Sequence, residues 1–203
     1  MSNEQLASIT KQIEKCQRCN LYKAATHAVP GSGNSDAKVV FIGEAPGFNE
    51  DAQGLPFVGN AGRYLDTLLA KVGLSRRDIF ITNMVKHRPP ENRDPTYPEI
   101  AACGLWLDEQ LAVLDPKVIV TLGRFSLARF LPNAKISTVH GQAFRAGKFV
   151  VVPMYHPAAA LRSLVTAREL EDDFLKNRLL LNDPYLANDI EQPYGEGGQG
   201  SLF

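Results

Sequence analysis

Residues 38–43, Lys-Val-Val-Phe-Ile-Gly, form the short apolar run that decides the fold. Three more runs of this kind follow at residues 78–82 (DIFIT), 117–122 (KVIVTL) and 149–153 (FVVVP). Each run is nearly continuous in valine, isoleucine or phenylalanine, which is typical of strands buried on both faces of a parallel sheet. We therefore predict four strands in one central, mainly parallel sheet.

Helical patterns separate these strands. Residues 62–72 place an apolar stripe on one side of a helix, and Gly73 follows as a helix-ending residue. Residues 98–114 carry a second apolar stripe, and a third helix is expected from about residue 166 to residue 181. Because strands alternate with helices, we predict an α/β fold, namely a three-layer α/β/α sandwich with a central four-stranded, mainly parallel sheet.

Length and composition fit one domain. The chain has 203 residues, 44% of them hydrophobic, which is enough for a single buried core. We predict one domain over residues 1–182 and a flexible, Gly-rich tail over residues 183–203. The formal net charge is zero, so a nucleic-acid-binding face would have to come from local clusters of basic residues.

The N-terminal segment is polar and lacks the apolar core of a signal peptide. The sequence contains no run of about 18 apolar residues that would span a bilayer. We therefore expect no membrane contact and a cytoplasmic location, where thiols stay reduced. The three cysteines cannot all pair with one another, which argues against a disulfide framework.

Three unusual loops follow the carboxyl ends of predicted strands. They read GEAPGFNEDAQGLPFVG at residues 43–59, NMVKHRPPENRDP at residues 83–95 and YHPAAALRS at residues 155–163. Ligands of open α/β sheets usually bind at these strand ends. The three loops therefore predict one composite site.

Four residues have the spacing and chemistry of metal ligands. Cys16 and Cys19 form a Cys-x-x-Cys pair, and His87 and Cys103 are distant candidates to complete the set. Cys103 alone would be interpreted as a small core residue, and Cys16 with Cys19 could form a redox pair. A Cys3His set could also hold zinc. The spacing favours a metal over none without selecting which metal.

The three loop sequences resemble the signatures of the family-four, iron–sulfur uracil-DNA glycosylases, in the correct order. The resemblance runs from about residue 16 to residue 181. It implies a DNA-repair enzyme that flips uracil out of DNA and hydrolyses its bond to deoxyribose, leaving an abasic site. No lysine stands at the motif positions as a Schiff-base nucleophile, so lyase activity is not expected.

The resemblance also implies a [4Fe–4S] cluster, which four cysteines hold in that family. This sequence matches three of them, Cys16, Cys19 and Cys103, and has His87 at the fourth position, within KHRPP. Imidazole can ligate iron, so we predict a Cys3His cluster with His87 as the fourth ligand. The alternatives are a three-cysteine cluster with a labile iron, or zinc in its place.

The resemblance places the uracil-binding residues on the same loops. Phe57 would stack on the base, and Asn83 would read it, because an amide both accepts from N3–H and donates to O4. Glu50 would form the wall that excludes the methyl group of thymine. The remaining predicted contacts of the base are Gly43, Ala45 and Gly47.

The predicted catalytic group is His156, matched to the family's catalytic histidine. It would stabilise negative charge that develops on O2 of the departing uracil. At the position of the usual Asp base this chain has Ala45, so Glu50, or second Glu44, is expected to orient the water. His27 and His140 have no motif context and are interpreted as structural or surface residues.

The DNA contacts follow from the same loops. Leu161 is predicted to fill the space of the extruded base, with Arg162 beside it for a phosphate. Lys86 and Arg88, with Arg93 as a weaker candidate, would hold the backbone. The substrate is expected to be single- or double-stranded DNA that contains uracil, and the protein a monomer.

The last five residues, QGSLF, resemble the pentapeptide by which bacterial repair proteins bind the sliding clamp. Gln199, Leu202 and Phe203 would be the anchors of that contact. Two other functions remain as alternatives: a non-catalytic binder of uracil or abasic DNA that bears a cluster, and a nucleotide-binding α/β enzyme. The sequence lacks any GxGxxG or Walker loop that would support the latter.

Overall fold

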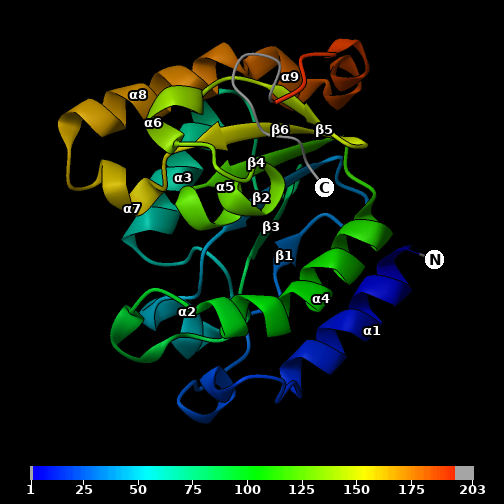
Figure 1. Ribbon diagram of the computed structural model, residues 1–203, viewed down its shortest axis with the longest axis vertical. Coiled ribbons are helices and arrows are strands. Elements are labelled where there is room, and N and C mark those ends of the chain that lie inside the picture. The colour runs from blue at the N-terminus through cyan, green and yellow to red at the C-terminus, as the bar shows by residue number, and fades with distance from the viewer. Residues whose placement is uncertain (1, 195–203) are drawn as a thin grey trace.

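A six-stranded sheet forms the centre of the computed structural model, which describes residues 2–194 (Figure 1). The strand order is β1-β3-β2-β4-β6-β5. The four inner strands pair in parallel, whereas β1 and β5 pair antiparallel with their neighbours at the two edges. The strands are β1 (Ser32–Gly33), β2 (Val39–Gly43), β3 (Phe80–Asn83), β4 (Val118–Leu122), β5 (Phe144–Ala146) and β6 (Phe149–Met154).

The four predicted parallel strands are confirmed, but the predicted number of strands was wrong. The two edge strands are only two and three residues long, and neither contains a continuous apolar run. The second strand also begins later than predicted. Asp78 instead accepts hydrogen bonds from the backbone N–H and the hydroxyl of Ser75, at 2.7 and 2.8 Å, and so closes the turn before β3.

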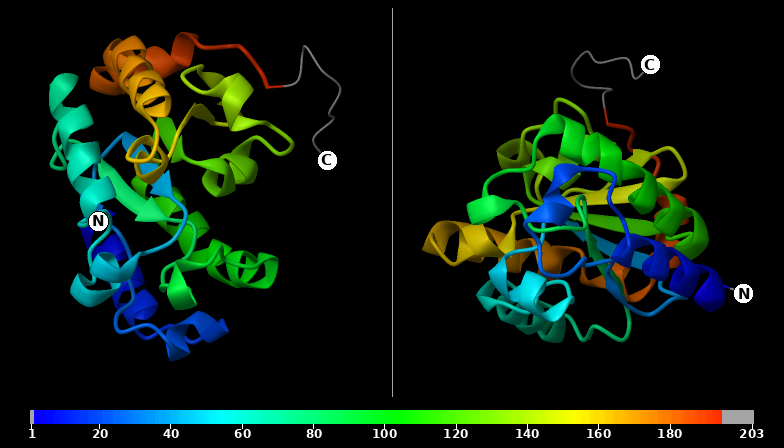
Figure 2. Two further views of the ribbon diagram at one scale, coloured as in Figure 1. Left: turned by 90° about the vertical axis from the view of Figure 1, so that its left-hand side faces the viewer. Right: turned by 90° about the horizontal axis from the view of Figure 1, so that it is seen from below.

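Helices cover both faces of the sheet, which confirms the three-layer sandwich (Figure 2). Buried side chains of α3, α8 and α9 pack on one face, where they meet Val39 and Phe41 of β2. Side chains of α1, α4 and α5 pack on the other face against Val40 and Ile42. Successive residues of a strand point to opposite faces, so a fully apolar run is what two covered faces require.

The helices agree closely with the sequence patterns, with one break. The third predicted helix is two helices, because α8 ends before Asn177 and α9 begins after it. The α-helices are α1 (Ser2–Glu14), α2 (Phe48–Gln53), α3 (Asn60–Lys71), α4 (Tyr97–Leu114), α5 (Arg124–Phe130), α6 (Ile136–Val139), α7 (Pro157–Ala160), α8 (Leu164–Lys176) and α9 (Arg178–Asn182). Three 3-10 helices are described beside them: η1 (Asn20–Lys23), η2 (Pro90–Asn92) and η3 (Pro184–Asp189).

The first part of the expected tail packs on the body of the protein. Ala187 is buried, and the Arg145 side chain of β5 donates hydrogen bonds to the backbone carbonyls of Ala187 and Ile190. The Arg145 N–H also donates to the Gln192 carbonyl at 2.7 Å. The predicted clamp-binding residues Gln199, Leu202 and Phe203 lie outside the described residues.

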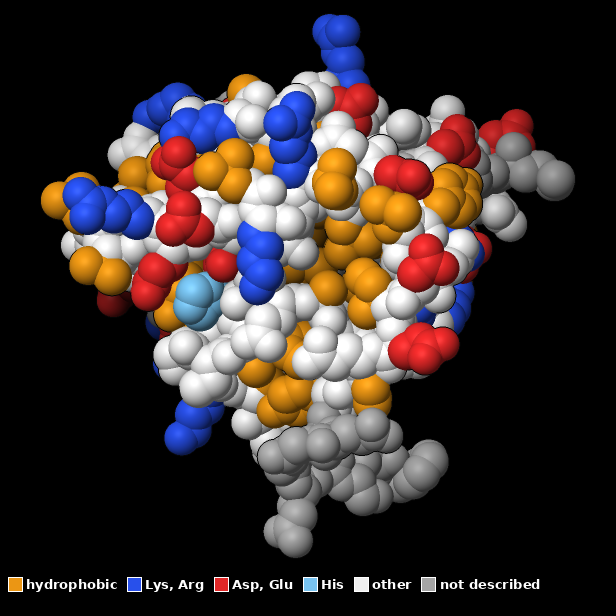
Figure 3. Space-filling model, turned by 90° about the horizontal axis from the view of Figure 1, so that it is seen from above, with side chains coloured by type: hydrophobic (Ala, Val, Ile, Leu, Met, Phe, Trp, Pro, Cys, Tyr) orange, Lys and Arg blue, Asp and Glu red, His pale blue; other side chains and the backbone are white. Residues whose placement is uncertain are grey.

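The face of the protein drawn in Figure 3 carries side chains of both charges. Figure 3 shows basic and acidic side chains interspersed over the face that it presents, without one broad basic area. In the part of the chain that the structure describes, no helix has the length and apolar character needed to cross a membrane.

Candidate active site

A cavity of about 440 Å³ lies where the three predicted loops meet at the carboxyl ends of the parallel strands. The loop after β2 contributes Glu44 to the wall, the end of β3 contributes Asn83, and the segment after β6 contributes His156. The structure thus brings the predicted residues Glu44, Ala45, Gly47, Glu50, Phe57, Asn83, His156 and Arg162 into one cavity lining. Pro46, Ala61, Pro89, Asn92, Arg93, Asp94, Ala158 and Ala159 complete it.

Gly43 allows the two predicted base-binding side chains to approach each other. It pairs in register with Asn83 across β2 and β3. A Cβ atom at Gly43 would lie 2.3 Å from Asn83 Oδ1 and 2.7 Å from Phe57 Cζ, which is closer than non-bonded atoms come. Gly43 is therefore needed for space, and any larger side chain would displace the amide or the aromatic ring.

Asn83 carries an unused acceptor at this cavity. The residue is 1% exposed, and its Oδ1 has no hydrogen-bond partner among the described residues. A buried acceptor without a partner costs about 1–3 kcal/mol, so it is a feature that a ligand N–H would relieve. Its place at the end of β3, beside Phe57, is where a planar base would present such a group.

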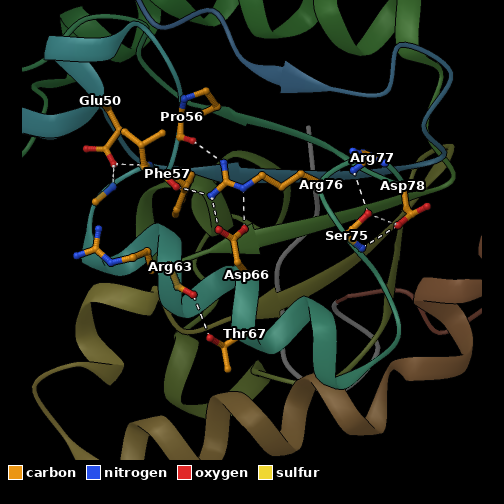
Figure 4. A network of polar contacts seen from close by, with 12 residues as sticks. Glu50, Pro56, Phe57, Arg63, Asp66, Thr67, Ser75, Arg76, Arg77 and Asp78 are labelled. Atoms are coloured by element: carbon orange, nitrogen blue, oxygen red, sulfur yellow. Dashed lines mark hydrogen bonds and ion pairs between the residues drawn. The ribbon is translucent and has the colours of Figure 1, made fainter.

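The segment that carries Phe57 is held in an unusual conformation. Phe57 has a φ of 54°, in the left-handed region that side chains other than glycine rarely adopt. Figure 4 shows the Arg76 guanidinium directed at the carbonyls of Pro56 and Phe57 and at the Asp66 carboxylate. A Cβ atom at Gly62 would lie 1.6 Å from the Phe57 carbonyl oxygen, so α3 can pass this close only with glycine there.

Glu50 holds the same segment from the opposite side. Its carboxylate accepts hydrogen bonds from the backbone N–H groups of Val58 and Gly59, at 2.8 and 2.9 Å. It also accepts one from the Gly47 N–H at 3.2 Å, which closes the first turn of α2. These three bonds occupy the carboxylate with backbone donors, as expected of a group that positions Phe57.

His156 lies between β6 and α7, and its ring faces Phe57. The centroids of the two rings are 5.5 Å apart with an interplanar angle of 27°. The backbone N–H of Ala158 donates to His156 Nδ1 at 3.1 Å, so in the neutral ring the proton is on Nε2. Burial lowers the pKa of His156 to about 4, against a smaller opposing effect of Glu50. The imidazole is therefore a neutral donor at physiological pH.

Glu44 is the acidic group of the cavity whose titration is most changed. Burial and, to a smaller extent, the nearby Asp94 raise the pKa of Glu44 to about 7, with Arg124 partly opposing them. A carboxylate with such a pKa can accept a proton at neutral pH far better than an ordinary one. Glu44 was the second candidate from sequence for orienting the water, after Glu50, whose carboxylate is bonded to the loop backbone.

The predicted DNA contacts differ in exposure and in the partners of their side chains. Leu161 is 51% exposed, and the exposed Arg162 lines the cavity beside it, as a wedge and a phosphate contact require. Arg88 lies with its guanidinium carbon 5.1 Å from the centre of the exposed Phe48 ring. The prediction for Lys86 was wrong, because this side chain is 0% exposed and cannot reach a phosphate. Arg93 forms an ion pair with Glu99 at 2.7 Å.

The predicted cluster ligands gather away from this cavity, between α1 and α4. Cys16, Cys19 and Cys103 pack in one apolar group with Trp106. The Cys16 sulfur accepts a hydrogen bond from Trp106 Nε1–H at 3.1 Å, and the Cys103 sulfur accepts one from the Lys86 N–H at 3.2 Å. His87 is buried and shares with Cys16 the lining of a cavity of about 150 Å³.

The chemistry of these residues fits an iron–sulfur cluster, since thiolate and imidazole both ligate cluster iron. Among the described residues no three His, Cys, Asp or Glu side chains come close enough together to hold one metal ion. Hydrogen bonds donated to sulfur are also the interactions that stabilise cluster thiolates. The donor set of three cysteines and His87 therefore suits a cluster.

The two remaining histidines lie outside the lining of the cavity of about 440 Å³. His27 instead lines the smaller cavity together with Cys16 and His87. His27 is exposed, and its Nδ1 is 2.8 Å from the Asp51 carbonyl oxygen. His140 Nδ1 is 2.9 Å from a carboxylate oxygen of Asp173.

Sequence reasoning missed the residues that support Phe57. Arg76 acts through contacts with residues 10 or more positions away, namely Asp66 and Pro56, whereas Gly62 acts through the Phe57 carbonyl five positions before it. A residue between Pro56 and Val58 with a left-handed backbone has no sequence signal. The proximity of Gly59 and Gly62 to Phe57 is the one sequence feature that could have indicated a crowded backbone there.

Comparison with known proteins agrees with this geometry. Residues 30–177 match the model of the uracil DNA glycosylase superfamily. The chain is 44% identical to the type-4 uracil-DNA glycosylase of Saccharolobus solfataricus, over 97% of this chain and 95% of that protein. It is 48% identical to the type-4 uracil-DNA glycosylase of Archaeoglobus fulgidus, over 85% of this chain and 92% of that protein. This chain belongs to the type-4 family of the uracil-DNA glycosylase superfamily.

Proposed function

We propose that the protein excises uracil from DNA by hydrolysing the bond between the base and deoxyribose. The observation that carries this proposal is the unpaired, buried Oδ1 of Asn83 at a cavity shared with Phe57 and His156. The N3–H of uracil can donate the hydrogen bond that this oxygen lacks, and O4 of uracil can accept one from the amide nitrogen of the same side chain. Cytosine presents the opposite pattern at both atoms, so the amide selects uracil.

The proposed reaction uses His156 and Glu44 at opposite ends of the breaking bond. As the bond between C1′ and N1 breaks, its electron pair passes to the uracil ring, and negative charge develops on O2. His156 Nε2–H donates a hydrogen bond to O2 and stabilises that charge. The oxygen of a water molecule bonds to C1′, and its proton passes to the Glu44 carboxylate. The uracil anion then takes up a proton from solvent, and Glu44 releases its proton to solvent, so the products are uracil and an abasic site.

Leu161 and Arg162 are proposed to hold the DNA during this reaction. Extrusion of a base costs a few kcal/mol, and an apolar side chain in the vacated stack offsets part of that cost. Leu161 has the exposure and the position for it, at the end of α7 and next to the cavity. Arg162 adds a positive charge for the phosphate beside the extruded nucleotide.

Excision of uracil is tested with the purified protein and oligonucleotides that contain one uracil, thymine or cytosine. We expect alkali-labile abasic sites only from the uracil strand, in single- and double-stranded form. Specific binding of uracil-containing DNA without any abasic product would contradict the enzyme assignment and would support the alternative of a non-catalytic binder.

The rate should depend on pH through Glu44. Because only the ionised carboxylate can take the proton from water, kcat/KM is expected to fall about tenfold per pH unit below pH 7 and to level off above it. His156 stays neutral down to about pH 4, so it adds no change between pH 5 and pH 8. Glu44→Gln should lower the rate about 100-fold and abolish the dependence near pH 7.

Glu50→Gln provides the matched control for this pH profile. Because its carboxylate is bonded to the loop backbone, the substitution should weaken substrate binding but keep the change in rate near pH 7. Loss of that change in Glu50→Gln, together with its persistence in Glu44→Gln, would exchange the roles of the two residues.

We also propose that Cys16, Cys19, Cys103 and His87 hold a [4Fe–4S] cluster. Three thiolates and one imidazole, with N–H donors directed at two of the sulfurs, suit this group. When bound, the cluster would supply covalent links between the segment after α1, the loop after β3 and α4. Such links join the N-terminal part of the chain to the loop that follows Asn83.

Removal of one ligand tests the cluster. We expect the purified protein to contain iron and sulfide and to show the visible absorbance of an iron–sulfur cluster. Cys16→Ala should lose that absorbance, because it removes one of the proposed ligands. His87→Cys should retain the absorbance, because it restores a four-thiolate set, and His140→Ala should retain it as a control, because His140 lies outside the cavity that Cys16 and His87 line. Stoichiometric zinc without iron would contradict the proposal.

We extend the proposal to the location of the protein and to its partners. A cluster held by thiolates requires a reducing compartment, so we propose that the protein works in the cytoplasm. We further propose that it acts as a monomer and that Gln199, Leu202 and Phe203 bind the sliding clamp.

A further inference from the structure

Lys86 is a fully buried lysine for which the activity so far described has no use. Its side chain is 0% exposed, although a buried charge is costly unless it is paired or fully hydrogen-bonded. No ion pair in the described part of the chain includes it. The ammonium group must therefore be held by neutral acceptors, and the identity of those acceptors indicates the role of Lys86.

Three acceptors surround the Lys86 ammonium group, one for each of its protons. Lys86 Nζ donates to Thr82 Oγ1 at 2.6 Å, to Gln110 Oε1 at 2.8 Å and to the Asn83 backbone carbonyl at 2.9 Å. Hydrogen bonds from a charged donor are about twice as strong as neutral ones. The group is thus satisfied at all three positions, and one of them belongs to the predicted uracil-reading residue.

The acceptors are fixed in turn by the rest of the core. Thr82 Oγ1–H and Gln110 Nε2–H both donate to the Pro30 carbonyl, each at 2.8 Å. This network links β3, α4 and the segment before β1 without any water-exposed member. The Asn83 carbonyl, which lies at the last residue of β3, is therefore anchored from inside the protein.

The backbone of Lys86 makes a second connection, because its N–H donates to Cys103 Sγ at 3.2 Å. One residue thus contacts both the end of β3 and a proposed cluster ligand. We infer that Lys86 is a positioning residue. It holds the Asn83 backbone, so that the side-chain amide of Asn83 keeps the orientation that reads uracil, and it joins Asn83 to the proposed cluster ligand Cys103. This inference rests on the proposed function.

The affinity for free uracil tests this role, because it requires no turnover. Lys86→Met keeps the length of the side chain but removes all three donors. We expect the dissociation constant for uracil, measured by titration calorimetry on the folded fraction, to rise roughly tenfold, since Asn83 loses one strong anchor. Lys148→Met removes an exposed lysine that pairs with Asp115 and should leave the affinity as in the wild type.

Two further variants separate positioning from general stability. In the Asn83→Ala background, Lys86→Met should cause no further loss of uracil affinity, because its effect passes through Asn83. Thr82→Val keeps the ammonium group and removes one acceptor, so a smaller rise in the dissociation constant is expected. It decides the question if Lys86→Met does not fold.

The outcomes also separate this inference from the proposed function. Wild-type protein that binds no uracil would refute the proposed function itself. Wild-type binding that is unchanged in folded Lys86→Met and in Thr82→Val would overturn the role of Lys86 alone, as would an equal loss from Lys86→Met with and without Asn83.

Discussion

His156→Ala should lower kcat for uracil excision by about 10²–10³-fold, the usual effect of losing one donor to a developing oxyanion. The neutral ring donates through Nε2 because Nδ1 already accepts from the Ala158 N–H. That bond strengthens as charge appears on O2, so the loss should fall on kcat and leave the KM nearly unchanged. Single-turnover excision kinetics at pH 7.5 would measure both.

His27→Ala is the matched control for this result. His27 is exposed and outside the cavity lining, so its replacement should leave kcat within about twofold of the wild type. A His156→Ala protein that excises uracil at the wild-type rate would remove the imidazole from the mechanism.

Asn83→Asp should lower kcat/KM for uracil by about 10³-fold or more, because a site built to hydrogen-bond a group strongly rejects a mismatch. The substituted carboxylate can still accept from N3–H but has no N–H for O4, and its charge repels that oxygen. Its size is almost that of the amide, so the space beside Gly43 and Phe57 is preserved. Excision rates on uracil-containing single strands give the measurement.

Asn188→Asp makes the same chemical change on η3, at an exposed position outside the cavity lining. It should leave kcat/KM for uracil nearly as in the wild type. Equal activity of Asn83→Asp and Asn188→Asp would mean that the amide does not read the base.

The central sheet could be predicted because its four parallel strands are buried on both faces. Val39 to Ile42 alternate between two cores, and this requires an unbroken apolar run that the sequence displays. The edge strands β1 and β5 have no such requirement, since each has a neighbouring strand on one side only. They are recognisable only when the neighbouring strand is in place.

Part of the cavity lining could be predicted from sequence, whereas its electrostatics could not. Phe57, Asn83 and His156 follow strands whose carboxyl ends meet, so their convergence follows from topology. Glu44 is proposed ahead of Glu50 as the water-orienting group because backbone N–H groups bond the Glu50 carboxylate, whereas Glu44 is buried near Asp94. Those are contacts between loops, and no local pattern encodes them.

The contacts of Lys86 are likewise not encoded by any local pattern in the sequence. A lysine in a loop with two arginines is normally exposed, and this expectation led to its prediction as a DNA contact. Its burial depends on Thr82, Gln110 and a carbonyl of β3, which come together only in the folded chain. The burial of the Lys86 side chain is therefore visible only in the structure.

The most direct test of this account is a crystal structure of the protein soaked with uracil. We predict that the base lies on the Phe57 ring, with N3–H and O4 on the Asn83 amide and O2 facing His156 Nε2. Uracil bound elsewhere, or in this cavity with its O2 and N3 edge turned away from His156 and Asn83, would contradict the assignment of the site.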